Sequence, residues 1–419
     1  MRDVRGDFPL LTRTVRNGKP LVYLDSGATA QRPRAVLDAV EDFELHHNSA
    51  VQRGAHLLAE EATEAFENAR AQVARLVGAR EDREIVWTAN ATSGLNLVAN
   101  GFANASAGIG GDESAAYRLG PGDTIVVTEA EHHANLVPWQ QLAVRTGATL
   151  RWVGLDADGV PRVEQLDEVV DGSTRVIAFG HASNVTGVIN PVEAFVAKAA
   201  QVGAFTVLDA CQSVPHLPVN LERLGVDFAA FSGHKMLGPT GVGALWGKAE
   251  LLDVLPGSIF GGGTVATVTM EHTTWHGAPT RFEAGSQAVA QAVGMGAAAA
   301  YLMDLGMDNV AAHDAALAAH LRAGVASIEG VRLLGPVDGP ALALAAFVVD
   351  GVHPHDVGQV LDDAGIAVRV GHHCTQPLHR HLGVTGSARA SASVYTTHAE
   401  IDAFLEALAG VRAFFGGAL

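Results

Sequence analysis

One confined lysine is the residue of this sequence best placed for nucleophilic chemistry. Lys235 follows an apolar run, Phe228–Phe231, and a small polar turn, Ser232-Gly233-His234, and the breaker-rich segment 238–241 comes soon after it. Most lysines extend into solvent on flexible stems. A lysine held between a strand and a rigid turn, and partly desolvated, can lose its proton and act as an amine nucleophile. An ordinary loop lysine is the alternative interpretation of this local sequence.

The chain holds only four lysines, so the alternatives to Lys235 can be compared directly. Lys19 lies in a polar Asn-Gly-Lys-Pro turn, and Lys198 lies in a helical run, where a solvated face is its ordinary place. Lys248 follows a predicted strand, where a chain usually exits to water. If this protein uses a Schiff-base lysine, Lys235 is the candidate.

Polar residues also follow other predicted strands. Asp209 comes directly after the apolar run 205–208, and Gln212 lies in the next turn. A carboxylate there can keep a ring nitrogen protonated, although such an aspartate is often a helix cap. Thr92 and Ser93 open a predicted helix, where free N–H groups and a hydroxyl suit a phosphate. This last signal is weak alone, because every helix start has it.

Further ring-binding and phosphate-binding candidates lie close to these positions. Ser232 and His234 place a hydroxyl and an imidazole beside Lys235. His132, after the strand 124–128, can stack on a flat ring or relay protons, although a loop histidine is more often simply solvated. Asn184 lies beyond the strand 175–179. An amine, a ring-nitrogen partner, a phosphate site and a stacking ring together meet the needs of pyridoxal 5′-phosphate (PLP).

A second candidate nucleophile, Cys374, lies in the last quarter of the chain. It ends the run Val-Arg-Val-Gly-His-His-Cys, which contains Arg369. A loop cysteine beside imidazoles and an arginine favours the reactive thiolate over an inert buried thiol. Arg389 could bind a substrate carboxylate through two parallel hydrogen bonds. Cys211 follows an apolar strand, and we expect it to be an inert packed thiol.

Composition narrows the classes of function. The net charge of −17 disfavours nucleic acid and anionic membrane surfaces as partners. The start of the chain has no signal-peptide pattern, and no apolar run reaches membrane-spanning length, so a cytoplasmic protein is expected. The histidine pairs at 132–133 and 372–373 match no metal-site spacing, so no metal is predicted. A nucleotide site fits less well than PLP, because a Walker A motif and a strand-coupled G-x-G-x-x-G are both missing.

Strand and helix patterns alternate through the first two thirds of the chain. This alternation predicts an α/β fold with a mainly parallel sheet that is covered by helices on both faces. Ligands bind beyond the carboxyl ends of such strands, where the polar candidates lie. From about residue 287 the pattern changes to long Ala-rich helices and a few strands. We expect a large domain over 21–287 and a smaller α+β domain from 1–20 and 288–419. The Gly/Ala/Ser-rich segment 103–118 is expected to be a surface loop.

Nine stretches, in this order, carry a resemblance to a known family. They are YLDSGATAQRP, ATSGLNLVAN, EHHANLVPWQ, ASNVTG, VLDACQSVPH, FSGHKMLGPTGVG, RFEAGS, VRVGHHC and ARAS, which together run from residue 23 to 391. The chain resembles the class V aminotransferase group of fold-type I PLP enzymes, and most closely the SUF-type (group II) cysteine desulfurases. The resemblance implies a mainly parallel, seven-stranded-type sheet with helices on both faces. It also implies a homodimer with a shared active site.

The resemblance implies a role for each candidate at its matching position. Lys235 would carry PLP, and Cys374 would take the sulfur of L-cysteine as a persulfide, leaving L-alanine for release. A protein acceptor would then collect the sulfur, for iron–sulfur cluster assembly or another pathway. The other implied roles are ring contacts by Asp209, Gln212 and His132, phosphate contacts by Thr92, Ser232 and His234, and substrate contacts by Asn184, Arg369 and Arg389.

Several departures from the family pattern bear on the substrate and the partner. Ser286-Gln287 stands where relatives usually have Thr-Pro. Ser286 keeps a hydroxyl, which in the family reaches the phosphate bound by the partner subunit. Gln52 replaces a common histidine, and Ser93 replaces a common acidic residue. A related PLP enzyme acting on selenocysteine or on a specialised substrate is therefore the alternative. A non-catalytic relay or scaffold protein is a third interpretation, which the presence of Lys235, Asp209 and Cys374 disfavours.

Overall fold

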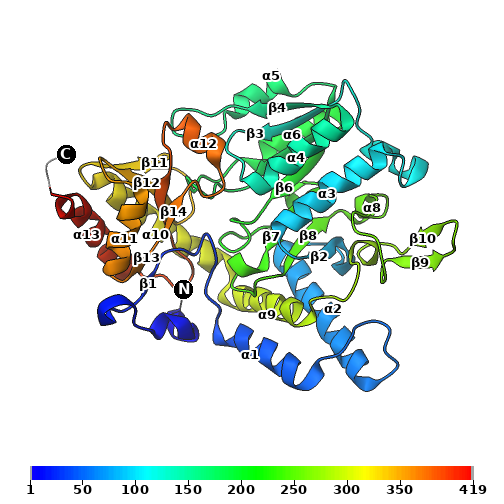
Figure 1. The fold of residues 1–419 in the computed structure, drawn as a ribbon, viewed down its shortest axis with the longest axis horizontal. Helices are drawn as coiled ribbons and strands as arrows, with labels where there is room; N and C mark the ends of the chain where they lie inside the picture. The colour runs from blue at the N-terminus through cyan, green and yellow to red at the C-terminus, as the bar shows by residue number, and fades with distance from the viewer. Residues whose placement is uncertain (1, 417–419) are drawn as a thin grey trace.

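A seven-stranded sheet forms the centre of the larger of two regions in this computed structural model, which describes residues 2–416 (Figure 1). The strand order is β2-β8-β7-β6-β5-β3-β4. Strand β8 runs antiparallel to both of its neighbours, and the other adjacent pairs are parallel. The predicted mainly parallel sheet is thus confirmed. Its strands are β2 (Ile85–Thr88), β3 (Thr124–Thr128), β4 (Thr149–Val153), β5 (Thr174–Gly180), β6 (Phe205–Asp209), β7 (Phe228–Ser232) and β8 (Gly243–Gly247).

Both faces of this sheet are buried under helices. Alternate residues of β5 belong to different cores: Ile177 packs with the helices of one face, whereas Val176 and Ala178 pack with those of the other. This explains why the strands are nearly continuous apolar runs in the sequence. One face carries α1 (Arg34–Asp42), α2 (Leu57–Val77), α5 (Leu166–Val169), α6 (Val192–Val202), α7 (Leu221–Leu224) and α9 (Val289–Leu305), and the other carries α3 (Ala91–Ser106), α4 (Val137–Thr146) and α8 (Ala249–Leu252).

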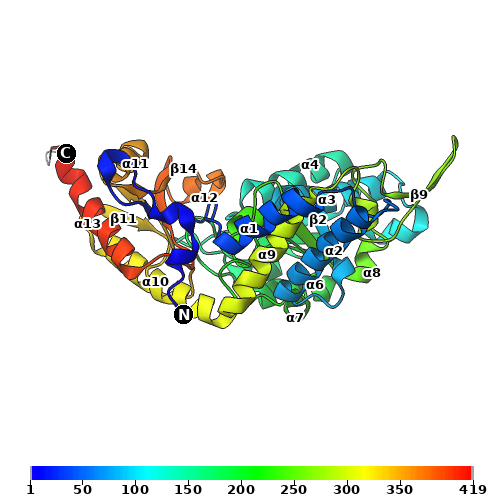
Figure 2. The same cartoon turned by 90° about the horizontal axis from the view of Figure 1, so that it is seen from below.

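A four-stranded antiparallel sheet, in the order β11-β12-β15-β14, forms the second region. It has its own apolar core, and strand β1 (Val22–Tyr23) joins the region by pairing with β13 (Ile366–Ala367). Helix α9 packs against α2 on the larger region and leads directly into α10 of the smaller one (Figure 2). The domain division at residues 21 and 287 stays a prediction. The remaining elements here are β11 (Val331–Leu334), β12 (Leu344–Val349), β14 (Arg369–Gly371), β15 (Ser387–Ser391), α10 (Met307–Ser327), α11 (Pro354–Asp363), α12 (Gln376–His381) and α13 (His398–Phe414).

The segment 103–118 lies largely at the surface, as its composition predicts, but much of it is helical and not a loop. Helix α3 continues through Ser106, and Gly111–Tyr117 forms a 3-10 helix. Tyr117 is fully buried and stacks on Phe205, with ring centroids 4.9 Å apart. One large aromatic ring holds this Gly/Ala-rich segment against the core, because burying such a ring is strongly favourable.

Three strands were also not predicted. Strands β9 (Val265–Val268) and β10 (Thr273–Trp275) form a hairpin that extends away from the larger region, and Met270 at its tip is almost fully exposed (Figure 2). Strand β15, which carries Arg389, was also missed, because its small residues, Ser-Ala-Arg-Ala-Ser, have low strand propensity. No helix within residues 2–416 combines the length and the apolar character needed to cross a membrane.

A buried ion pair ties α2 to the loop before α9. Arg70 donates two hydrogen bonds to the Glu283 carboxylate, at 2.7 and 3.0 Å, and both side chains are almost completely buried. Glu283 also accepts a hydrogen bond from the backbone of Trp87, at 2.8 Å. The Arg70 charge opposes the effect of burial, which raises the pKa of Glu283. This pair holds the loop that continues to Ser286.

Replacing Arg70 with methionine is expected to lower the free energy of unfolding by about 3–5 kcal/mol, because it leaves the Glu283 charge buried without a partner. Denaturant titration of the purified protein measures this change. Arg75→Met is the matched control, since Arg75 lies on the same helix but is exposed. The control should change the free energy by less than about 0.5 kcal/mol. Equal effects of the two substitutions would contradict the assigned role of the pair.

Candidate active site

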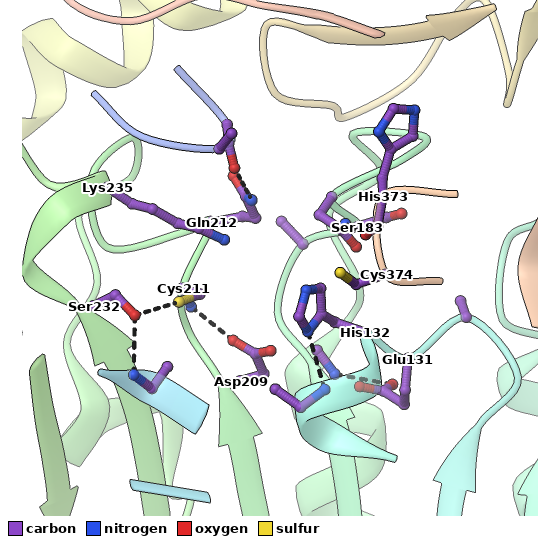
Figure 3. Close-up of a pocket in the computed structure, with 18 of the residues that line it drawn as sticks. Glu131, His132, Ser183, Asp209, Cys211, Gln212, Ser232, Lys235, His373 and Cys374 are labelled. Carbon is purple, nitrogen blue, oxygen red and sulfur yellow. Dashed lines mark hydrogen bonds between the residues drawn. The ribbon is translucent and has the colours of Figure 1, made fainter. Parts of the chain in front are cut away.

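A cavity of about 300 Å³ opens at the carboxyl ends of β5, β6 and β7. Gly180, Asp209 and Ser232, the last residues of these three strands, all line it. The cavity also receives residues from the smaller region, so both sheets contribute to one site (Figure 3). The predicted site residues that line the cavity are Thr92, His132, Asn184, Asp209, Gln212, Ser232, His234, Lys235, Arg369, Cys374 and Arg389.

Lys235 ends a short 3-10 helix, Gly233–Lys235, that follows β7 directly. Its side chain extends into the cavity (Figure 3). Lys198 and Lys248 are held by carboxylates, each at 2.6 Å, whereas Lys235 has no carboxylate partner among residues 2–416. A lysine amine that is half-buried and not held by a counter-ion is available for covalent chemistry.

Asp209 faces the cavity from the end of β6. Its Oδ1 atom accepts a hydrogen bond from the backbone of Cys211, at 2.9 Å, which fixes the carboxylate at the floor of the site (Figure 3). Burial raises the pKa of Asp209, and the positive charge of Lys235 partly offsets this. A half-buried carboxylate of this kind can pair with a protonated ring nitrogen in the cavity.

The start of helix α3 forms one wall of the site. Asn90 caps the helix, since its side chain accepts a hydrogen bond from the backbone of Ser93, at 2.9 Å. The Ser232 hydroxyl accepts a hydrogen bond from the backbone of Ala91, also at 2.9 Å. Thr92 lies between these two positions, in the first turn of the helix, and it lines the cavity. This arrangement suits an anion.

His132 is held as a neutral ring with a defined tautomer. The backbone of Ala134 donates a hydrogen bond to His132 Nδ1, at 3.0 Å, so the ring proton must lie on Nε2. Burial, together with the positive charge of Lys235, lowers the pKa of His132 to about 3. The ring therefore supplies a flat surface and an Nε2–H donor near neutral pH. His234 is also neutral there, because burial and the Lys235 charge lower its pKa to about 4.

Gln212 and Asn184 both use their side chains to hold loops at the cavity. Gln212 Nε2 donates to the Gly27 carbonyl, at 3.0 Å. Asn184 Nδ2 donates to the His373 carbonyl at 2.7 Å, and Asn184 Oδ1 accepts from the Thr375 hydroxyl at 3.1 Å. Asn184 therefore binds the residues on either side of Cys374.

Cys374 is an exposed free thiol at the rim of the cavity. Its carbonyl accepts a hydrogen bond from the backbone of His133, at 2.7 Å. The neighbouring His373 does not supply the positive charge that the sequence suggests, because burial and the nearby Arg389 lower its pKa to about 2. The positive groups that interact with Cys374 are instead Arg369 and Arg389.

The two arginines share one carboxylate, that of Asp25. Arg369 donates to both Asp25 oxygens at 3.1–3.3 Å, and Arg389 Nη2 lies 3.6 Å from Oδ1. Arg389 is buried and donates to the Asn184 carbonyl, yet its Nε and Nη2 atoms lack a hydrogen-bond partner among the described residues. The trio has one positive charge in excess, so it suits one further carboxylate.

Two predicted residues lie outside this cavity. Ser93 donates its hydroxyl to the Asn90 side chain and, with Ser286, lines a neighbouring cavity. Ser286 also lines a third cavity, beside Gln52. Contacts of Ser93 and Ser286 with a cofactor stay predictions.

Glu131 is a cavity residue that the sequence alone did not single out. It accepts hydrogen bonds from Thr128 at 2.6 Å and Asn135 at 2.7 Å. Burial, with a smaller contribution from the Asp209 charge, raises the pKa of Glu131 to about 7. The only feature of the sequence that could have indicated Glu131 is its position directly before His132. Asp25 was also missed, because its partners are more than 300 residues away.

The residues of this site fit PLP. The cofactor has an aldehyde for an amine, a ring nitrogen for an acid and a phosphate for N–H and hydroxyl donors. Lys235, Asp209 and the start of α3 offer these groups around one cavity. Within residues 2–416, no group of three or more His, Cys, Asp or Glu side chains is arranged to hold a metal ion.

Comparison with known proteins agrees with this arrangement. A family model described as aminotransferase class-V matches residues 22–404. A Mycobacterium leprae protein named probable cysteine desulfurase 2 is 53% identical over 415 residues, which cover 99% of this chain and 97% of the relative. A Streptomyces coelicolor protein named probable cysteine desulfurase is 48% identical over 416 residues, with the same coverage.

Solved structures show the same likeness. The cysteine desulfurase CsdA from Escherichia coli superposes with a TM-score of 0.86 at 37% identity, and 98% of each chain is covered. An apo cysteine desulfurase from Thermococcus onnurineus has a TM-score of 0.90 at 35% identity, covering 100% of this chain and 99% of the other. The chain therefore belongs to the aminotransferase class-V family, as its motifs predicted, and over nearly its full length it is similar to cysteine desulfurases.

Proposed function

We propose that this chain is a PLP-dependent cysteine desulfurase, which converts L-cysteine to L-alanine and keeps the sulfur as a persulfide on Cys374. The observation that carries the proposal is the convergence on one cavity of a free thiol, an amine without a counter-ion and a guanidinium with two nitrogen atoms that lack a hydrogen-bond partner among the described residues. The relatives with 53% and 48% identity carry the name of this activity.

Residues of the larger region would hold the cofactor. Lys235 Nζ would bind its aldehyde carbon, Asp209 its ring nitrogen, and Thr92 and Ser232 its phosphate. His132 would lie against the ring as a neutral imidazole. When bound, PLP supplies an electron sink for negative charge that develops on the substrate carbons.

Lys235 and Cys374 would divide the chemistry between them. Lys235 Nζ is the amine placed to take a proton from the substrate α-carbon. Cys374 Sγ, as the thiolate, attacks the substrate sulfur. A sulfur–sulfur bond forms, the carbon–sulfur bond breaks with its electron pair on carbon, and protonation of that carbon completes alanine. The sum is L-cysteine plus the Cys374 thiol giving L-alanine plus the Cys374 persulfide.

Arg389 would bind the substrate carboxylate, and this role can be tested. Arg389→Lys is expected to raise KM for L-cysteine about tenfold or more, because a two-pronged, charge-assisted contact is lost. Steady-state measurement of alanine checks this. Arg332→Lys is the matched control, since Arg332 lies in the same sheet, on β11, but is exposed. An unchanged KM in Arg389→Lys would exclude the carboxylate contact.

The function itself is tested by supplying L-cysteine and L-selenocysteine in separate reactions. We expect alanine from L-cysteine, with one added sulfur on Cys374 detected by mass spectrometry. Alanine from L-selenocysteine alone would favour the alternative, a selenocysteine lyase. If the protein binds no PLP and makes no alanine, the remaining interpretation is the non-catalytic relay or scaffold protein.

The wider setting is also part of the proposal. A homodimer would bring Ser286 of one subunit to the phosphate bound by its partner, which is consistent with its place in a separate surface cavity. Cys374, at the exposed rim, would pass its sulfur to an acceptor protein for iron–sulfur cluster assembly or another sulfur-requiring pathway. A cytoplasmic location stays the expectation from the sequence.

A further inference from the structure

The backbone around Cys374 has an unusual conformation. Cys374 has φ +57° and His373 has φ +50°, so two consecutive residues with side chains lie in the left-handed region. This conformation is uncommon for residues other than glycine, and it persists only where the surroundings hold it in place. The contacts that hold it therefore decide where the Cys374 thiol points.

A buried set of linked hydrogen bonds lies beside this loop, and it includes two side chains that do not line the cavity. The Ser387 hydroxyl lies 2.9 Å from Nε2 of His373 and 2.9 Å from Nε2 of His379. His379 Nδ1 lies 2.9 Å from the carbonyl of Thr375. This series of hydrogen bonds thus begins at His373 and ends at Thr375, the two residues that flank Cys374. Ser387 and His379 are both fully buried, and they come from β15 and α12.

The chemistry of the partners determines which atom carries the proton in each of these hydrogen bonds. A carbonyl can only accept, so His379 Nδ1 must carry a proton and its Nε2 must be an acceptor. The Ser387 hydroxyl then donates to His379 Nε2 and accepts from His373 Nε2–H. His373 Nδ1 is left as a buried acceptor without a partner among the described residues. Burial lowers the pKa of both histidines, which keeps both rings neutral.

We propose that Ser387 and His379 are positioning residues for Cys374, which hold His373 and Thr375 so that the thiol faces the substrate cavity. The inference rests on the proposed function, in which Cys374 takes the substrate sulfur. Neither residue lines the cavity, so neither touches substrate or cofactor. Their contribution reaches the reaction only through the loop.

This role predicts a change in kcat without a matching change in KM. Ser387→Ala removes the central hydroxyl and leaves His373 Nε2–H and His379 Nε2 without partners. The loop can then relax from its left-handed conformation, and a displacement of the thiol by about 1 Å can cost as much as about a hundredfold in rate. We expect kcat for alanine formation to fall about 10- to 100-fold, with KM for L-cysteine and the absorbance of bound PLP nearly unchanged.

His379 gives a second, independent set of variants on another element. His379→Asn keeps an N–H donor near the position of Nδ1 and loses the link to Ser387, whereas His379→Leu loses both contacts. We expect kcat to fall more in His379→Leu than in His379→Asn. His381→Leu is the matched control, since His381 lies on the same helix and contacts a backbone carbonyl, of Asp156 at 2.7 Å, but is exposed. It should keep the parent kcat.

A double-mutant cycle with Cys374→Ser decides whether the effect passes through the thiol. If it does, Ser387→Ala slows the parent protein but adds nothing to Cys374→Ser. Equal slowing in both backgrounds, a parent-like kcat in both Ser387→Ala and His379→Leu, or a rise in KM equal to the fall in kcat would overturn the inference. Full alanine formation by Cys374→Ser itself would overturn the proposed function instead, so the two failures are distinguishable.

Discussion

Lys235→Ala is expected to lower kcat/KM for L-cysteine by on the order of 10⁴-fold or more, because it removes both the covalent attachment of PLP and a proton-transfer group. The purified variant, supplied with PLP, should lack the visible absorbance of the lysine-linked cofactor. Alanine formation and the absorption spectrum of the same sample measure the two losses together. We expect both losses because the lysine amine lies in the cavity and has no carboxylate partner among the described residues.

Lys198→Ala is the matched control for this experiment. Lys198 lies on α6, where Asp167 holds it at 2.6 Å, and it does not line the cavity. Its removal should leave the spectrum and the activity near those of the parent. A Lys235→Ala protein with the parent spectrum would place the cofactor on another group, and it would remove the basis of the proposed chemistry.

Cys374→Ser is expected to bind PLP normally but to lower alanine formation by at least about 10³-fold, since loss of a catalytic nucleophile can cost up to about 10⁶ in kcat. Mass spectrometry should detect no persulfide on the protein after incubation with L-cysteine. The serine hydroxyl occupies the same place, but at neutral pH it is a far weaker nucleophile than a thiolate. The retained PLP spectrum separates this defect from that of Lys235→Ala.

The other cysteine provides the comparison. Cys211 is buried, and its thiol lies 3.4 Å from the Ser232 hydroxyl. Burial raises the pKa of Cys211, which disfavours its thiolate. Cys211→Ser should therefore still form a persulfide, and the added sulfur should lie on Cys374. A persulfide found on Cys211 would contradict the assignment of the acceptor thiol.

The strand-end residues illustrate what can be predicted from sequence. Asp209, Ser232 and Lys235 each follow a continuous apolar run, and parallel strands carry their carboxyl ends to one edge of a sheet. The periodicity that reveals the strands therefore also predicts that these side chains meet. The shared cavity of these three residues agrees with that prediction.

Predictions from composition were less reliable. The segment 103–118 looked like a loop because it is rich in small residues, yet the burial of Tyr117 folds it into helix and 3-10 structure. His373 looked like a source of positive charge for Cys374, yet burial keeps its ring neutral. In both cases, tertiary packing outweighs what the local sequence favours.

The sequence by itself determined the α/β fold, the family and most of the chemical groups that line the cavity, because periodicity and motif order are local properties of the chain. Only the tertiary structure decided how Cys374 is held and which groups surround it. Asp25 lies between Arg369 and Arg389, and Ser387 links His373 to His379, across separations in sequence that carry no local signal. These residues come from different elements in or beside the smaller region, where burial requires each polar group to find a partner.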